Sequence, residues 1–265
     1  MIGTATGIGQ QSAAPAVASW LPPSDSGQRP RGAWVTGSFR AAHQATRLSV
    51  SALFDGNLHE VTACFSSARD WQTEHDADTG CQVFSVRIHL PSGAADLITH
   101  TVPGFRAQPT NEPMEPVVLV PLASPRTAPS GYTGLRYHST HAFGLIDGNG
   151  RTHWARLEWR PVYARKPLPY AQARALPHNY LTQGLATVLP ARFNLCAMLA
   201  KPGDDVHNPA AVWAETGLRR LLGTLAVHRT RESPCPQPDF DALRLPPGIA
   251  PPRDLLIRRR AARPH

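Results

Sequence analysis

The sequence has no hydrophobic run long enough to cross a bilayer and too few cysteines to hold a small fold together. No segment approaches the roughly 20 consecutive apolar residues of a transmembrane helix, so no membrane partner is expected. The first residues also lack the basic start of a signal peptide. The cysteines form no C-x-x-C pair and no metal-ligand spacing, which argues against a zinc site or a disulfide framework and favours the cytoplasm. They are Cys64, Cys81, Cys196 and Cys235.

Charge is also sparse, and its distribution gives little support to a nucleic-acid partner. The formal net charge is +8, but the basic residues cluster only near the C-terminus, at Arg258, Arg259, Arg260 and Arg263. Proteins that bind nucleic acid usually concentrate positive charge on one element or interleave it with aromatic residues. We therefore expect a small-molecule substrate or ligand, with anionic compounds included.

The chain is rich in residues that break helices, and its regular segments alternate like strands. With 27 prolines and 20 glycines, an all-helical bundle is excluded. Alternating apolar residues predict strands over 32–39, 60–65, 82–90, 95–99, 140–146, 152–159, 192–199 and 220–228, and helices over 41–53, 179–188 and 209–215. A proline-rich connection is expected over 104–134. The order predicts an α+β protein, an antiparallel β-barrel with surrounding helices.

The two ends of the chain differ in composition. Residues 1–28 are rich in small and polar residues without a sustained period, which predicts an extended or partly disordered arm. Residues 29–265 are expected to form a single domain.

Three stretches, taken in order, resemble the catalase superfamily and especially its short, catalase-related peroxidases. The resemblance covers roughly residues 29–263. The first stretch begins at Arg29-Pro30-Arg31-Gly32 and ends at Gly37-Ser38-Phe39. The second includes Val61-Thr62-Ala63-Cys64-Phe65-Ser66, Asp96-Leu97-Ile98 and Pro103-Gly104-Phe105. The third includes Asn179-Tyr180-Leu181, Arg192-Phe193-Asn194-Leu195, Gly223-Thr224-Leu225 and Leu245-Pro246-Pro247-Gly248-Ile249.

The resemblance implies a ferric haem with a tyrosine phenolate below the iron and a histidine above it. Arg29 stands at the position of the histidine, and its guanidinium cannot accept a peroxide proton. In the R-x-x-x-Y arrangement of the tyrosine, Arg259 matches the arginine and Arg263 stands in the tyrosine place. His265 is the remaining candidate for an iron ligand there, although a terminal residue is usually mobile. The cofactor therefore stays open: the resemblance implies haem, but its usual ligand is absent.

Two further positions of the family's haem site are substituted. Cys64 replaces an arginine that commonly meets a haem propionate, and His100 stands where the family often has an asparagine. The candidate catalytic residues are therefore Arg29, His100 and Cys64, and the candidate cofactor-binding residues are Arg259 and Arg263. Cys64 has an alternative interpretation as a small buried residue.

Three functions remain open at this stage. The first is a catalase-fold protein with a degenerate haem site, which no longer disproportionates peroxide and acts as a specialised biosynthetic enzyme or binds a ligand. The second is a haem peroxidase or peroxygenase with an atypical iron ligand. The third is a non-catalytic subunit or interaction partner of another protein. Because oligomers are common in the family that the sequence resembles, a homo-oligomer is also possible. His138 and His141 lie three residues apart and are interpreted as ordinary strand residues, so no separate metal site is expected.

Overall fold

The computed structural model describes most of the chain from Gly32 to Ile257. The described residues are 32–67, 75–78, 81–101, 105–108, 118–121, 127–209, 211, 213, 219–234, 237–254 and 257. The expected arm over 1–28 lies outside the described residues, as do Arg29, Arg259, Arg263 and His265.

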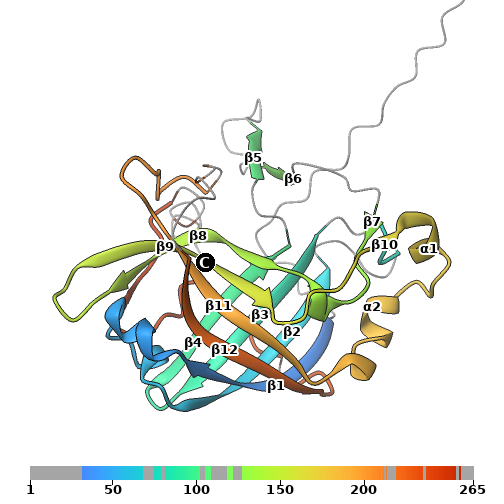
Figure 1. The fold of residues 1–265 in the computed structure, drawn as a ribbon, viewed down its shortest axis with the longest axis horizontal. Coiled ribbons are helices and arrows are strands. Elements are labelled where there is room, and N and C mark those ends of the chain that lie inside the picture. The colour runs from blue at the N-terminus through green and yellow to red at the C-terminus, as the bar shows by residue number, and fades with distance from the viewer. Residues whose placement is uncertain are drawn as a thin grey trace, which may run out of the picture.

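Eight antiparallel strands close into a barrel (Figure 1). Their order around the barrel is β8, β4, β3, β2, β1, β12, β11 and β9, and β9 pairs again with β8 to complete the circle. The strands are β1 Gly32–Ala41, β2 Leu58–Ser67, β3 Gln82–Leu90, β4 Gly93–His100, β8 Tyr137–Ile146, β9 Thr152–Pro161, β11 Ala191–Leu199 and β12 Arg219–Thr230. The expected antiparallel barrel is confirmed.

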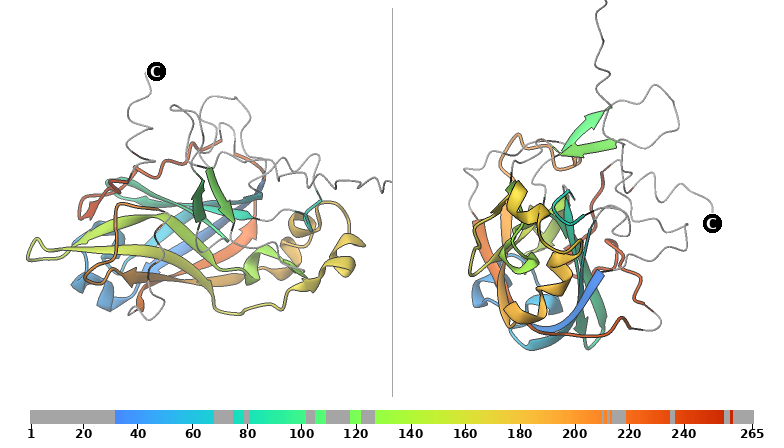
Figure 2. Two further views of the ribbon diagram at one scale, coloured as in Figure 1. Left: turned by 90° about the horizontal axis from the view of Figure 1, so that it is seen from above. Right: turned by 90° about the vertical axis from the view of Figure 1, so that its right-hand side faces the viewer.

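Short elements decorate the two ends of the barrel. Helices α1 Tyr170–Arg174 and α2 Tyr180–Gln183 lie at one end, and the 3-10 turns η1 His43–Arg47 and η2 Ala52–Phe54 lie at the other (Figures 1 and 2). Two small two-stranded sheets pair β5 Phe105–Gln108 with β6 Val118–Pro121 and β7 Thr127–Ala128 with β10 Leu168–Pro169. The remaining elements are η3 Tyr132–Gly134, η4 Ala186–Val188 and β13 Ile249–Ala250, which pairs with β8.

Aromatic side chains fill the inside of the barrel. Phe65 stacks on Phe84 with ring centroids 4.1 Å apart, and Phe84 lies 5.3 Å from Phe193 and 5.2 Å from Tyr137. All four are fully buried. Because successive side chains of a strand point to opposite faces, their neighbours along the chain point out of the barrel. The alternation seen in the sequence is thus the alternation between core and outer face.

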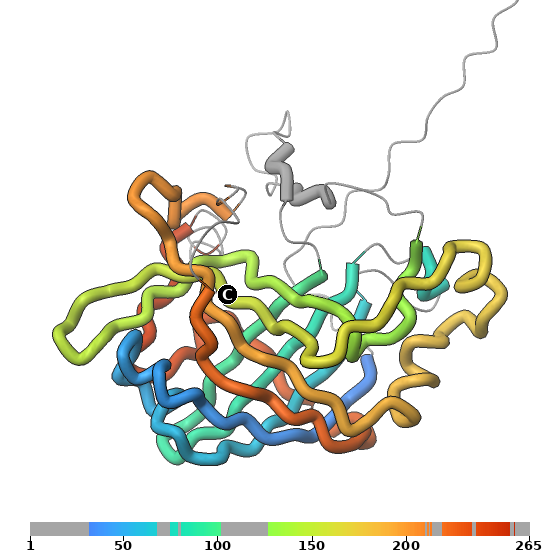
Figure 3. Tube along the Cα trace, viewed as in Figure 1, coloured from blue at the N-terminus to red at the C-terminus, as the bar shows by residue number. Residues whose placement is uncertain are grey.

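The hairpin of β8 and β9 forms as its sequence predicts. The Asp147 carboxylate accepts hydrogen bonds from the backbone N–H groups of Asn149 and Arg151, and Gly150 takes a positive φ of 77°. This tip projects beyond the barrel at the end that carries the 3-10 turns (Figure 3).

The helix expected over 41–53 is wrong. Strand β1 continues to Ala41, and only two 3-10 turns follow. Between the turns, the backbone N–H of Val50 donates to Ile146, and the Ser49 hydroxyl donates to the carbonyl of Gly248. These tertiary hydrogen bonds hold the segment extended where an isolated sequence favours a helix.

The helix expected over 179–188 is only partly correct, because it is split. Helix α2 ends at Gln183 with Gly184 as its C-cap, and the 3-10 turn η4 follows. Most of the helix expected over 209–215 lies outside the described residues.

The C-terminal strap, defined here as residues 237–254, packs beside β4 and β8 and, in addition to the contact between Ser49 and Gly248, is anchored at three places. The buried Asp96 carboxylate accepts hydrogen bonds from Arg87, from the Nε of Arg244 and from the backbone N–H of Asp241. Farther along, β13 pairs with β8. Finally, the carboxylate of Asp254 is hydrogen-bonded to the Nδ1 of His141 at 2.5 Å. The strap is therefore fixed along its length to β3, β4 and β8.

Among the described residues, no helix is both long enough and apolar enough to cross a membrane.

Candidate functional site

A row of polar side chains lies along one rung of hydrogen-bonded strands on the outer face of the barrel. Cross-strand pairing joins Ser66 on β2 to Val83 on β3, Val83 to His100 on β4, and His100 to His138 on β8. The same rung continues from His138 to Glu158 on β9 and from Glu158 to Cys196 on β11. We call Ser66, His100, His138, Glu158 and Cys196 the outer rung. Their neighbours Phe65, Thr99, Tyr137, Trp159 and Leu195 point inward and are almost completely buried.

The outer rung is hidden from solvent although it faces away from the core. Ser66, His100, Glu158 and Cys196 are all buried, with exposed fractions of 9% or less, and His138 is half-buried. Outward positions of antiparallel sheets are usually solvated and polar. Buried ionisable groups on such a face are typical of binding and catalytic sites, where burial changes their proton affinity.

His100 is held in place by a short hydrogen bond. Its Nε2 lies 2.6 Å from the Oγ1 of Thr140 on β8. This contact fixes the buried imidazole ring between β4 and β8, and the role of His100 as a site residue stays a prediction.

Cys64 lies on the same outer face as His100, but the two residues do not meet. Cys64 is two residues before Ser66 on β2, and two strand spacings of about 4.8 Å separate β2 from β4. Burial raises the pKa of Cys64 to about 12, and its Sγ donates only a weak hydrogen bond to the carbonyl of Phe65. A Cβ built on Gly32 would lie 2.5 Å from this Sγ, so the thiol is packed tightly against β1. The geometry supports the small buried residue rather than a reactive thiolate.

The five tyrosines of the chain do not fit a phenolate iron ligand. A ligand of this kind needs an anionic phenolate, but burial raises the pKa of Tyr132, Tyr137 and Tyr180. The hydroxyls of Tyr137 and Tyr180 donate to backbone carbonyls at 2.9 and 2.6 Å. Tyr170 donates to Asp78, and Tyr163 is 79% exposed. None of the five tyrosines therefore lies where its phenolate form would be favoured. A haem held by tyrosinate does not fit these residues.

A second group of polar residues, on β8, β9, β11 and β12, overlaps the outer rung because it includes His138 and Glu158. A small pocket here is lined by His138, Ser139, Arg156, Leu157, Glu158, Met198 and Arg219. Glu158 is 5% exposed, and within the described part of the chain its Oε1 accepts no hydrogen bond. The guanidinium Nε atoms of Arg219 and Arg160 lie 3.4 and 3.8 Å from its carboxylate oxygens.

Arg156 and His138 complete the electrostatics of this pocket. The guanidinium of Arg156 donates to the carbonyls of Ala211 and Asn208 and lies over the ring of Trp213, 4.5 Å from its centroid. Burial lowers the pKa of His138, which favours the neutral imidazole. The pocket therefore combines a carboxylate, two guanidiniums and a neutral imidazole.

Sequence reasoning did not find these pocket residues. His138 is interpreted from the sequence as an ordinary strand residue, and Glu158, Arg156 and Arg219 belong to no motif. The one sequence feature that these residues share is that each charged or polar residue alternates with apolar residues along its strand. Cross-strand register, which brings them together, is not encoded in any one segment.

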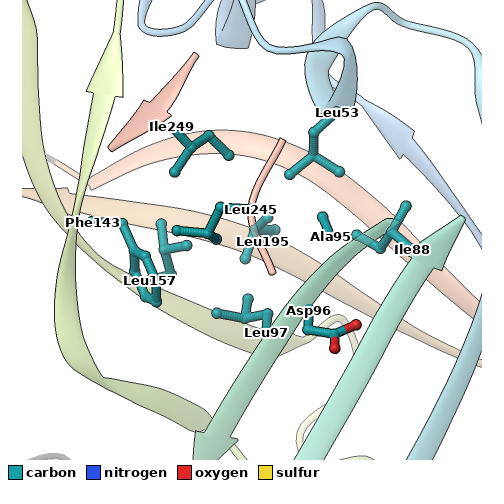
Figure 4. A pocket seen from close by; sticks show the side chains of 10 residues that line it. All are labelled: Leu53, Ile88, Ala95, Asp96, Leu97, Phe143, Leu157, Leu195, Leu245 and Ile249. Carbon is teal, nitrogen blue, oxygen red and sulfur yellow. The ribbon is translucent and has the colours of Figure 1, made fainter. Parts of the chain in front are cut away.

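A second pocket lies inside the barrel and is apolar (Figure 4). Its lining consists of Leu53, Ile88, Ala95, Leu97, Phe143, Leu157, Leu195, Leu245 and Ile249, with Asp96 at its margin. Since the Asp96 carboxylate is fully engaged with the C-terminal strap, this pocket offers only apolar contacts. It is a feature of core packing rather than a reactive site.

The described residues contain no cluster of three or more His, Cys, Asp or Glu side chains that could hold a metal ion. His141, one of the two histidines considered above, instead pairs with Asp254.

Comparisons with known proteins point to one superfamily. No family model matches the chain. It is 26% identical over 260 residues to a catalase-related peroxidase of Mycolicibacterium paratuberculosis, covering 86% of this chain and 83% of the relative. It is 23% identical over 266 residues to a catalase-related peroxidase of Synechococcus elongatus, with 87% and 78% covered.

Solved catalases share the fold. A fungal catalase aligns with a TM-score of 0.73 at 15% identity, covering 89% of this chain. Catalase A of Saccharomyces cerevisiae aligns with a TM-score of 0.71 at 15% identity, covering 88%. The chain spans slightly more than half of these two structures, 57% and 59%. In sequence, this chain is similar to catalase-related peroxidases, and it shares the fold of the solved catalases.

Proposed function

We propose that this protein is a catalase-fold enzyme or binding protein that acts on a small organic molecule at the outer rung and does not disproportionate hydrogen peroxide through a tyrosinate-bound haem. The observation that carries the proposal is the environment of the tyrosines. Three have their pKa raised by burial, and the phenols of Tyr137 and Tyr180 donate to backbone carbonyls. A phenol that donates to a carbonyl is stabilised as the neutral form, which is the opposite of what an iron ligand needs.

The substitutions of the haem site agree with this proposal. Arg29 stands at the position of the distal histidine, and Cys64 stands at that of the propionate arginine. A buried thiol with a pKa of about 12 carries no charge at neutral pH and cannot replace a guanidinium as the partner of a carboxylate. A specialised biosynthetic role is thus more consistent with the chain than general defence against peroxide.

His100 is the group that we propose to contact the substrate. It is buried, and its imidazole is oriented by Thr140, so it is placed to donate or accept one proton without reorganisation. The other residues of the outer rung are mostly buried, so they would keep water away from the substrate. We place the protein in the cytoplasm on the basis of its cysteine pattern.

A second candidate function is favoured by the names of the sequence relatives. Both of the relatives reported above are catalase-related peroxidases, and this supports a peroxidase-like oxidoreductase. In that case the protein would hold haem through a group other than tyrosine. A subunit that pairs with a second protein, or with another copy of itself, is the third proposal.

Haem content separates the first two candidates. The protein is expressed with a haem precursor, and its absorbance from 350 to 700 nm and its pyridine haemochrome are measured. We expect less than about one haem per ten chains. A stoichiometric Soret band that survives gel filtration would overturn the proposal and support the peroxidase-like alternative.

The role of His100 is tested with a small-molecule library. Ligands that raise the melting temperature of the wild type are tested again on His100→Gln, with His89→Gln as the control. His89 lies exposed on β3 and bonds only to Thr62 among the described residues, so its substitution should leave ligand binding unchanged. Equal binding to both variants would remove His100 from the site.

A further inference from the structure

We propose that the pocket between β8, β9, β11 and β12 is a binding site for a small α-hydroxycarboxylate. This inference goes beyond the proposed function, because the pocket would bind its ligand whether or not His100 performs chemistry. Three observations carry it: the position of the arginines, the balance of charge, and two buried hydrogen-bonding atoms that have no partner among the described residues.

Strand register places two arginines on either side of one methionine. Met198 on β11 is the cross-strand partner of Arg156 on β9 and of Arg219 on β12. All three residues line the pocket. Two arginines in the lining of one pocket can bind a planar anion, since guanidinium geometry matches that of a carboxylate.

The charges of the lining favour an anion. Arg156 and Arg219 contribute two positive charges, Glu158 contributes one negative charge, and His138 is neutral because burial lowers its pKa. The lining therefore retains one positive charge. Arg156 is only 9% exposed and Arg219 has a side-chain exposure of 32%, so water screens this charge incompletely.

Two buried atoms of the pocket residues have no hydrogen-bond partner within the described ranges: the acceptor Oε1 of Glu158 and the donor Nε of Arg156. A buried polar atom that lacks a partner costs about 1–3 kcal/mol, so the structure favours a ligand that pairs with both. The ligand must then offer an acceptor to Arg156 and, close by, a donor to Glu158.

The donor is a hydroxyl rather than an ammonium group. Glu158 already lies 3.4 Å from the Nε of Arg219 and 3.8 Å from that of Arg160. A third cation beside this carboxylate would be repelled by both guanidiniums, whereas a neutral hydroxyl donates without adding charge. A carboxylate with a hydroxyl on the adjacent carbon meets both requirements in one small molecule.

Four small probes separate these requirements. Glycolate carries both groups, acetate lacks the hydroxyl, glycolamide lacks the charge, and glycine replaces the hydroxyl with an ammonium. Binding to the full chain is measured by NMR titration with ¹³C-labelled probes. We expect glycolate to bind at least about ten-fold more tightly than the other three, because each of them loses a hydrogen bond or gains a repulsion.

Substitutions locate the site. Arg219→Gln should weaken glycolate binding at least about ten-fold, whereas the charge-matched control Arg220→Gln, an exposed neighbour outside the lining, should not change it. Glu158→Gln should reduce the preference for glycolate over acetate. Glu158 is buried, so the Glu158→Gln variant can fail to fold. The Arg219→Gln variant tests the site in that case as well.

His100→Gln separates this inference from the proposed function. Glycolate binding that survives in this variant supports the pocket, whatever the library screen shows for His100. Equal affinity for glycolate and acetate, no binding of glycolate, or binding that Arg219→Gln leaves intact would each overturn the inference.

Discussion

Substitution of Asp96 by asparagine should strongly destabilise the protein, because this carboxylate joins the barrel to the C-terminal strap. Its side chain is completely buried. Arg87 donates two hydrogen bonds to it, at 2.7 and 2.6 Å, and the Nε of Arg244 donates a third at 3.0 Å. The backbone N–H of Asp241 donates a fourth, at 2.9 Å. Asp96→Asn keeps the volume but removes the charge and turns one acceptor into a donor that faces a guanidinium.

The size of the effect follows from the exposure of the two arginines. Removing one partner of a buried ion pair costs about 3–5 kcal/mol when the other charge stays buried. The side chain of Arg87 is 15% exposed and that of Arg244 is 44% exposed, so water recovers part of the loss. We therefore expect the lower end, about 3 kcal/mol, which corresponds to a decrease in melting temperature of about 6–12 °C for a chain of this size.

A matched substitution serves as the control. Asp78 pairs with Arg174, but their side chains are 36% and 46% exposed, so Asp78→Asn should cost less than about 1 kcal/mol. Both variants are compared with the wild type by urea and thermal denaturation followed by circular dichroism. If Asp96→Asn came within about 1 kcal/mol of the control, the strap would not depend on this carboxylate and the reasoning would be refuted.

Three more predictions concern the barrel and the outer rung. Because burial raises the pKa of Cys64 to about 12, iodoacetamide at pH 8 should label this thiol only in urea, as measured by mass spectrometry; rapid labelling of the folded chain would contradict this. Burial lowers the pKa of His138 below the ordinary histidine value of about 6.5, so the unfolded chain binds the proton more readily. Stability should therefore fall as the pH decreases below about 6.5, by up to about 1.4 kcal/mol per pH unit. His138→Gln should lose less stability between pH 7.5 and 5 than the wild type does, and parallel pH profiles would show that this histidine does not contribute. Gly32→Ala should cost about 1–3 kcal/mol, because the new Cβ would lie 2.3 Å from the carbonyl oxygen of Phe65, whereas Gly131→Ala meets open space and should be neutral in the same denaturation assay.

The strands were predictable because their signal is local. The segment 82–90 alternates apolar and polar residues from Phe84 onward, and a D-G-N-G turn separates the strand-like segments 140–146 and 152–159; the structure forms β3, β8 and β9 there. The conformation of residues 41–53, where the sequence predicts a helix and the structure forms two 3-10 turns, was not predictable in the same way. Ser49 and Val50 form hydrogen bonds with residues about 100 to 200 positions away, and these decide the local conformation.

The candidate site was only partly visible in the sequence. His100 was predicted from its place in a family motif, and the structure pairs its imidazole with Thr140. Glu158 and Arg219 were missed because their significance depends on the register of β9 with β8 and β11 and of β11 with β12. The role of Asp96 was hidden for the same reason. In the sequence it belongs to a short motif, whereas in the structure it anchors the distant C-terminal strap.

The three anchors of the C-terminal strap also define how the molecule should respond to mechanical load. A force applied to the chain after Ile257 reaches the contact between Asp254 and His141 first, then the short pairing of β13 with β8, and only then the Asp96 cluster. The last anchor gathers several charge-assisted hydrogen bonds on one buried carboxylate, and the closed barrel lies beyond it. The strap should therefore detach in steps, and the eight-stranded barrel should stay intact until the hydrogen bonds of the Asp96 carboxylate break.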